Sequence, residues 1–199
     1  MIVVGLTGGI GSGKTTAAKL FRSFNIPIYI ADVEAKLLMN TSKGIKQELI
    51  ALFGEEAYLK DELNRPFIAD KIFNDKVYLD KMNAIVHPKV GAHFKQWLER
   101  QNSPYVIKEV AIIFEHEQQS QYDLIISIIA DKDKRLQRVL ARDKSTPEKV
   151  LAIMNNQMND IEKAKLSDFV IVNNDKSTLE YQVRKIHESI LKHIKNSTI

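Results

Sequence analysis

The sequence contains no cysteine. A disulfide framework, a thiolate zinc site and a cysteine nucleophile are therefore excluded, and the absence suits a reducing cytoplasm, which is the location we expect. No stretch approaches the roughly 20 apolar residues of a membrane helix, so we expect no membrane association. The first residues, MIVVGLTGG, lack a basic start and their apolar run is soon broken by glycines, which argues against a signal peptide.

Charge of one sign is not concentrated in any segment. Lysine and arginine number 29 against 25 acidic residues, so the net charge is only +4. This mildly basic balance suits an anionic small molecule, and without a basic tail it does not predict a nucleic-acid partner. The chain of 199 residues is long enough to bury one hydrophobic core without disulfide bonds or a structural metal. We expect a monomer with a single domain.

Short β-branched runs alternate with helical patterns along the chain. Strands are predicted at residues 2–6, 26–30, 105–110, 124–130 and 169–172. Helices are predicted at residues 14–24, 33–39, 44–53, 65–73, 76–86 and 89–99. Continuous apolar strands separated by helices are typical of a parallel sheet covered on both faces. The fold class is therefore α/β, with a five-stranded parallel sheet and helices on both faces.

Residues 8–15, GGIGSGKT, satisfy the P-loop pattern G-x-x-x-x-G-K-[ST]. Glycines let the backbone turn several N–H groups toward phosphate oxygens, and the following helix adds the positive end of its dipole. The lysine can reach the β- and γ-phosphates, while the threonine hydroxyl can ligate magnesium. A predicted strand before and a helix after supply the required context. The predicted binding set for ATP and Mg²⁺ is Gly9, Gly11, Ser12, Gly13, Lys14, Thr15 and Thr16, with Thr15 as the metal ligand.

Two acidic residues follow or end predicted strands. Asp32 lies just past the second strand, where a carboxylate could accept a proton from an attacking hydroxyl or help to hold magnesium. It could equally be the N-cap of the next helix. Glu109 ends the third strand, where it could orient magnesium, but a solvated or salt-bridged residue is the slightly favoured interpretation.

Arg135, Arg138 and Arg142 share one face of a predicted helix. Arginine forks match phosphate oxygens and stabilise charge in phosphoryl transfer. A solvated stripe paired with Asp143 and Glu148 is the alternative. Because this region holds more residues than a crossover needs, we favour a lid over residues 132–150.

About 75 residues separate the second and third strands, far more than a single crossover requires. Most of this stretch has helical patterns. We therefore predict a single domain, residues 1–199, with a helical insertion at about 33–100 that binds the acceptor.

These features together resemble the dephospho-CoA kinase family, whose members phosphorylate the ribose 3′-hydroxyl of dephospho-CoA to give coenzyme A. The resemblance is carried, in order, by GLTGGIGSGKT (5–15), IAD (30–32), ELNRPFIADKIF (62–73), NAIVHP (83–88), AIIFE (111–115), RLQRVLARD (135–143), Gln157 and DFVIVNN (168–174). It implies a P-loop kinase core with a substrate-binding insertion and a lid. It also implies ATP, Mg²⁺ and dephospho-CoA as ligands.

The resemblance assigns roles residue by residue. It implies that Asp32 is the catalytic base, acting with Lys14 and Arg138. Arg142 and Asn173 would contact ATP. The acceptor site would comprise Thr7, Asp32, Arg65, His87 and Glu115. From spacing alone, His87 is a structural histidine.

The sequence departs from the family pattern at four positions. Ile30 replaces the first acid of Asp-Ala-Asp, so the base falls on Asp32 alone. Ala111 replaces a proline, Thr15 a serine and Asp175 a glycine.

Two other functions are weighed. Another nucleoside or nucleotide kinase would share the P-loop and lid but not the acceptor motifs. A GTP-binding switch needs N-K-x-D, whereas residues 173–176 are NNDK, and no D-x-x-G follows the second strand.

Overall fold

The computed structural model describes residues 1–197, leaving aside the side chains of residues 74 and 197. The chain divides into two compact units, one formed by Met1–Tyr29 with Gln101–Ile199 and the other by Ile30–Arg100. Each unit has its own hydrophobic interior, which includes Leu6 and Ile126 in the first unit and Ile45 and Leu49 in the second.

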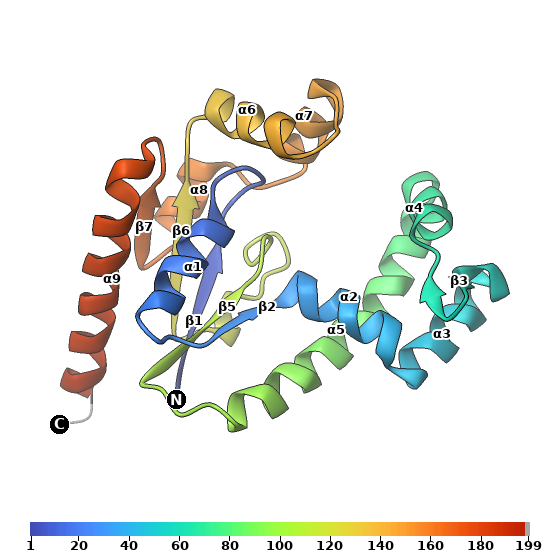
Figure 1. The fold of residues 1–199 in the computed structure, drawn as a ribbon, viewed down its shortest axis with the longest axis horizontal. Coiled ribbons are helices and arrows are strands. Elements are labelled where there is room, and N and C mark those ends of the chain that lie inside the picture. The colour runs from blue at the N-terminus through green and yellow to red at the C-terminus, as the bar shows by residue number, and fades with distance from the viewer. Residues whose placement is uncertain (198–199) are drawn as a thin grey trace. The chain divides into compact units, whose positions relative to one another are not determined.

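The first unit is built on a five-stranded sheet of order β2-β5-β1-β6-β7 (Figure 1). Its strands are β1 (Ile2–Thr7), β2 (Ile28–Ile30), β5 (Tyr105–Glu109), β6 (Leu124–Ile129) and β7 (Phe169–Val172). The central strand β1 pairs in parallel with β5 and β6, and β6 pairs in parallel with β7. The predicted α/β class with a five-stranded parallel sheet is confirmed.

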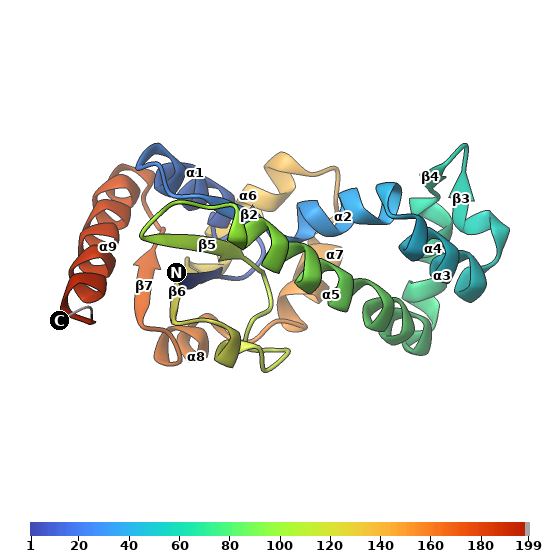
Figure 2. The same ribbon diagram turned by 90° about the horizontal axis from the view of Figure 1, so that it is seen from below.

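Helices cover both faces of this sheet, as predicted. The helices of this unit are α1 (Lys14–Ser23), α6 (Lys132–Arg142), α7 (Pro147–Asn155), α8 (Asp160–Lys165) and α9 (Lys176–Ser197), with a short helix η2 (Gln119–Gln121). Helices α1 and α9 pack together on one face, and α8 packs on β6 from the other (Figure 2). The carboxyl ends of parallel strands meet at one edge, so the segments that follow β1, β5, β6 and β7 converge there.

The second unit contains α2 (Ala31–Thr41), α3 (Lys43–Phe53), η1 (Glu55–Ala57), α4 (Arg65–Asn74) and α5 (Lys76–Glu99). Between η1 and α4, β3 (Tyr58–Leu59) and β4 (Glu62–Leu63) form an antiparallel hairpin. Polar residues start three of the helices: the side chains of Ser42, Asn64 and Asp75 accept backbone N–H groups at the first turns of α3, α4 and α5. These bonds satisfy donors that a helix N-terminus leaves without intrahelical partners.

The prediction of two helices around Pro88 is wrong, because α5 runs through that residue without a break. A proline inside a helix removes one backbone hydrogen bond and crowds the carbonyl four residues earlier. Val86, Val90 and Phe94 are nevertheless buried along one side of α5, on both sides of the proline. Burial of this apolar face keeps the helix continuous.

Candidate active site

The P-loop connects β1 to α1 and is folded tightly against its neighbours. Gly11 and Gly13 have φ values of 78° and 102°, a left-handed conformation that side chains rarely adopt. A Cβ atom at Gly13 would also lie 2.1 Å from Nδ2 of Asn173. Gly13 is the N-cap of α1, so the positive end of the helix dipole lies at the loop.

The Lys14 ammonium lies over the P-loop itself. Its Nζ atom donates to the carbonyl oxygens of Gly8 at 2.7 Å and Gly9 at 3.4 Å. Thr15 and Thr16 follow in the first turn of α1 and are exposed. A lysine ammonium beside a glycine-rich loop that opens a helix is the arrangement that favours a phosphate chain.

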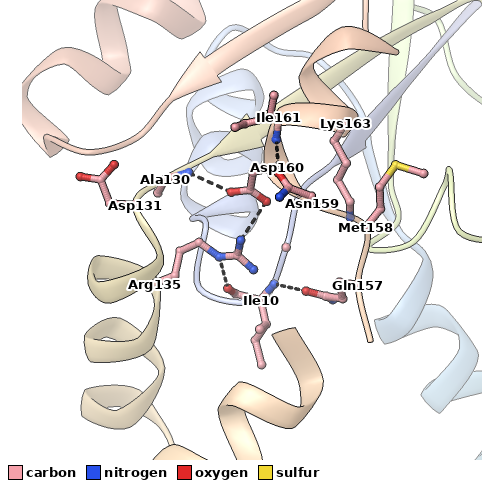
Figure 3. Close-up of polar contacts among 12 residues, drawn as sticks. Ile10, Ala130, Asp131, Arg135, Gln157, Met158, Asn159, Asp160, Ile161 and Lys163 are labelled. Carbon is pink, nitrogen blue, oxygen red and sulfur yellow. Dashed lines mark hydrogen bonds and ion pairs between the residues drawn. The ribbon is translucent and has the colours of Figure 1, made fainter. Parts of the chain in front are cut away.

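The residue at the crest of the P-loop, Ile10, is held from both sides (Figure 3). Its N–H donates to Oε1 of Gln157 at 2.9 Å, and its carbonyl accepts Nε of Arg135 at 2.9 Å. Arg135 also forms an ion pair with Asp160, whose other oxygen accepts the N–H of Ala130. We call these two hydrogen bonds to Ile10, with the ion pair behind them, the Ile10 clamp.

The interpretation of three arginines as one exposed stripe is wrong for Arg135. Only 7% of this residue is exposed, because its guanidinium is enclosed between the P-loop and Asp160. Arg142 is exposed and forms two hydrogen bonds with Asp143, which lower the pKa of that carboxyl. The expected pairing with Asp143 is thus present at Arg142, at the end of α6.

Arg138 and Asn173 join the P-loop to α6 and to the end of β7. Arg138 Nη2 donates to the carbonyl of Asn173, and Asn173 Nδ2 donates to the carbonyl of Ser12, both at 2.7 Å. Within the described part of the chain, three buried atoms here have no hydrogen-bond partner: Ser12 Oγ, Arg138 Nη1 and Asn173 Oδ1. Buried polar atoms left this way fit a site that a polar ligand or water completes.

Thr7 and Glu115 are linked through the Ala111 carbonyl and Lys163 at the turn that follows β5. The Thr7 hydroxyl donates to the carbonyl of Ala111 at 3.1 Å, and Nζ of Lys163 donates to the same oxygen at 3.3 Å. Lys163 is completely buried and pairs with Glu115 at 2.7 Å. Glu115 also accepts the N–H of Met158. The role of Lys163 could not be predicted from the sequence, because no motif near it indicates that it pairs with the distant Glu115.

Of the two interpretations of Glu109, solvated or salt-bridged, the solvated one is wrong, and the salt-bridged one stays a prediction. Glu109 ends β5 and is only 8% exposed, in register with Leu6 of β1. The preceding Lys108 is equally buried, and this burial lowers the pKa of its ammonium. Both side chains therefore belong to the interior of the first unit.

Three predicted acceptor-site residues belong to the second unit. Asp32 is the second residue of α2 and Ile30 is the N-cap, so the N-cap interpretation of Asp32 is wrong. Its exposed carboxylate lies in the first turn, where the helix dipole stabilises negative charge. Arg65 is the first residue of α4, and His87 lies within α5 immediately before Pro88. Both are exposed.

Residues 1–197 contain no cluster of three or more His, Asp or Glu side chains suited to a metal ion. Within the same range, no helix is long and apolar enough to cross a membrane.

The sheet order, the P-loop after the central strand and the arginines of α6 define an α/β P-loop phosphotransferase of the kinase type. A crystal structure from Thermus thermophilus superposes with a TM-score of 0.86 at 31% identity, covering 94% of this chain and 96% of that chain. Dephospho-CoA kinase from Campylobacter jejuni has the same fold, with a TM-score of 0.70 at 24% identity over 96% of this chain and 98% of its own.

Sequence comparison then identifies the family. The profile described as Dephospho-CoA kinase matches residues 2–179. Dephospho-CoA kinase of Bacteroides fragilis is 33% identical over 93% of this chain and 91% of its own length. Dephospho-CoA kinase of Listeria monocytogenes is 34% identical over 97% of this chain and 98% of its own length. The chain therefore belongs to the dephospho-CoA kinase family, and the resemblance and the transferase class inferred from the sequence are confirmed.

Proposed function

We propose that the protein transfers the γ-phosphoryl group of ATP to the ribose 3′-hydroxyl of dephospho-CoA, giving coenzyme A and ADP. This is the final step of coenzyme A biosynthesis, the reaction of its family. The observation that carries the proposal is a complete P-loop, with Lys14 over its carbonyls, in a chain that matches the family from residue 2 to residue 179. A cytoplasmic monomer acting on two small molecules is part of the proposal.

In the donor site, the N–H groups of the P-loop would bind the phosphate chain. The residues are Gly9, Gly11, Ser12, Gly13, Lys14, Thr15 and Thr16. The Lys14 ammonium would exchange its bonds to the Gly8 and Gly9 carbonyls for phosphate oxygens. Arg138 and Arg142 on α6 would bind phosphates, and residues 132–150 would close over them as a lid.

Asn173, which is hydrogen-bonded to the P-loop, would contact the nucleotide. Its Nδ2 donates a hydrogen bond to the Ser12 carbonyl, while its buried Oδ1 has no hydrogen-bond partner within the described residues. That oxygen and Nη1 of Arg138 are an acceptor and a donor that ATP could satisfy, directly or through water.

The donor groups present fit magnesium. Mg²⁺ in phosphoryl-transfer sites is held by one or two protein oxygens together with substrate phosphates and water, so an acidic cluster is not required. Thr15, exposed beside Lys14, is the hydroxyl that would hold it. When bound, the ion neutralises charge on the β- and γ-phosphate oxygens.

On the acceptor side, Asp32 would take the proton of the attacking 3′-hydroxyl. Its exposed place in the first turn of α2 supports this role, since a carboxylate there is accessible to a substrate hydroxyl. The segment 33–100 would bind dephospho-CoA, with Arg65 and His87 as exposed contacts. Thr7, the last residue of β1, and Glu115, which follows β5, are further contacts that we propose for dephospho-CoA.

Incubation with ATP, Mg²⁺ and dephospho-CoA is expected to add the mass of one phosphate to dephospho-CoA. The measurement is mass spectrometry of the product, with adenosine, AMP and shikimate as alternative acceptors and GTP as an alternative donor. Phosphorylation of another acceptor in preference to dephospho-CoA would contradict the assignment. A strict preference for GTP would instead favour the nucleotide switch.

Thr15→Val is expected to raise the Mg²⁺ concentration for half-maximal activity by roughly tenfold, because the side-chain hydroxyl on the metal is lost. Thr15→Ser keeps the hydroxyl and should behave like the parent protein. The measurement is a magnesium titration of the initial rate at saturating ATP. An unchanged titration for the valine variant would remove Thr15 as the ligand.

A further inference from the structure

Arg135 is buried at the crest of the P-loop, where a charged side chain is costly unless it is paired and hydrogen-bonded. We propose that Arg135 is a positioning residue that sets the shape of the P-loop through the Ile10 clamp. The inference rests on the proposed function only in naming ATP as the ligand of the loop.

The two ends of the clamp come from different elements. Arg135 on α6 holds the Ile10 carbonyl, and Gln157, which follows α7, holds the Ile10 N–H (Figure 3). Asp160, at the start of α8, fixes the guanidinium through Nη1 at 2.8 Å. Both polar groups of one loop residue are thereby occupied by protein, so the crest cannot rotate without breaking a buried contact.

The planar guanidinium suits this arrangement. Nε points to the loop and Nη1 to the carboxylate, so one side chain binds two partners in different directions. A lysine has a single terminal nitrogen and lacks this fork. Arg135 is also 93% enclosed, and its Nε and Nη1 atoms both have hydrogen-bond partners, which distinguishes it from Arg138 and its unpartnered buried Nη1.

Gly9 supplies an independent observation. A Cβ atom at Gly9 would lie 2.0 Å from Nη2 and 2.6 Å from Cζ of Arg135. Gly9 is absent from the residues with positive φ, so its backbone does not itself require glycine. The close approach of the guanidinium is what excludes a side chain there. At Gly11, a Cβ atom would lie 2.4 Å from the Arg135 carbonyl oxygen, so the same residue touches the loop at two glycines.

The consequence for function is preorganisation of the phosphate site. With the crest fixed, the N–H groups of the loop converge before ATP arrives, and the free energy of binding is not spent on ordering them. Loss of the clamp should therefore weaken phosphate binding while leaving the affinity for dephospho-CoA unchanged.

Arg135→Met and Gln157→Leu test the clamp from its two sides. Both are expected to weaken ATP and ADP binding in calorimetry by roughly tenfold or more and to raise the KM for ATP, with the KM for dephospho-CoA unchanged. Arg135→Lys should recover only part of the loss. The control is Arg184→Met, which removes an exposed arginine that pairs with Glu180 on α9. Unaltered ATP affinity in folded Arg135→Met and Gln157→Leu, even with a lower melting temperature, would overturn the proposal.

A double-mutant cycle with Gly9 tests the contact itself and remains informative if Arg135→Met is unstable. Gly9→Ala alone is expected to weaken ATP binding strongly, because the methyl group displaces the guanidinium. In an Arg135→Ala background the same change should cost much less, since the colliding atoms are gone. Additive effects would contradict the proposal. Nucleotide binding needs no acceptor, so a failed dephospho-CoA assay would leave both results interpretable.

Discussion

Asp32→Asn is expected to lower kcat about 10³-fold, while ATP binds as before. The amide has nearly the size of the carboxylate but cannot accept a proton from the attacking hydroxyl, and general-base catalysis contributes about 10²–10⁴-fold. Ile30 stands where the family has a first acid, so no second carboxylate in this motif can take over.

The experiment compares kcat, the KM for both substrates and the calorimetric affinity for ATP. Glu34→Gln is the matched control, since it also removes a charge from the first turn of α2, where Glu34 faces His93 at 3.8 Å. A loss common to both variants would indicate a general effect of charge on α2. Near-normal turnover of Asp32→Asn would remove the assignment of the base.

Lys163→Met is expected to lower the free energy of unfolding by about 3–5 kcal/mol, the range for removing one partner of a buried ion pair. Lys163 is completely buried and binds both Glu115 and the Ala111 carbonyl. Without the ammonium, the Glu115 carboxylate, 15% exposed, would lose its counter-ion. The turn after β5 would also lose one of the donors that hold it.

Urea unfolding measures this change, and Lys165→Met on the exposed side of α8 is the control. The double variant Lys163→Met with Glu115→Gln should recover part of the stability, because no charge is then left unpaired. Parent-like stability of Lys163→Met would contradict the expectation. Comparing the double variant with Lys163→Met also tests the proposed acceptor role of Glu115: a KM for dephospho-CoA that rises only when Glu115 is replaced would support substrate contact.

The elements that were predicted well are those whose signals are local. The P-loop motif, the strand before it and the helix after it lie within some twenty consecutive residues, and the five apolar runs each became a strand. The errors arose where distant packing outweighed a local preference. Pro88 would end an isolated helix, but the buried side chains on both sides of it keep α5 intact. The hairpin β3–β4 was missed because its strands have only two residues each.

The residues of the candidate site likewise divide into those that a local motif predicts and those that depend on distant packing. Lys14 and Thr15 could be assigned from their spacing to glycines, since the motif itself states their chemistry. Helical periodicity placed Arg135, Arg138 and Arg142 on one face, but periodicity cannot show what that face contacts. Arg135 is enclosed by the P-loop and Asp160, Arg138 reaches the end of β7, and Arg142 stays exposed.

By itself, the sequence determined that this protein has a phosphate-binding loop in an α/β fold, and it pointed to the family through ordered motifs. Both conclusions depend on residues that act through their neighbours in the chain. The tertiary structure alone decided that Arg135 holds Ile10, that the Arg135 guanidinium leaves no room for a side chain at Gly9, and that Lys163 pairs with Glu115. These contacts join residues between about 48 and 126 positions apart, brought together because parallel strands end at the same edge of the sheet.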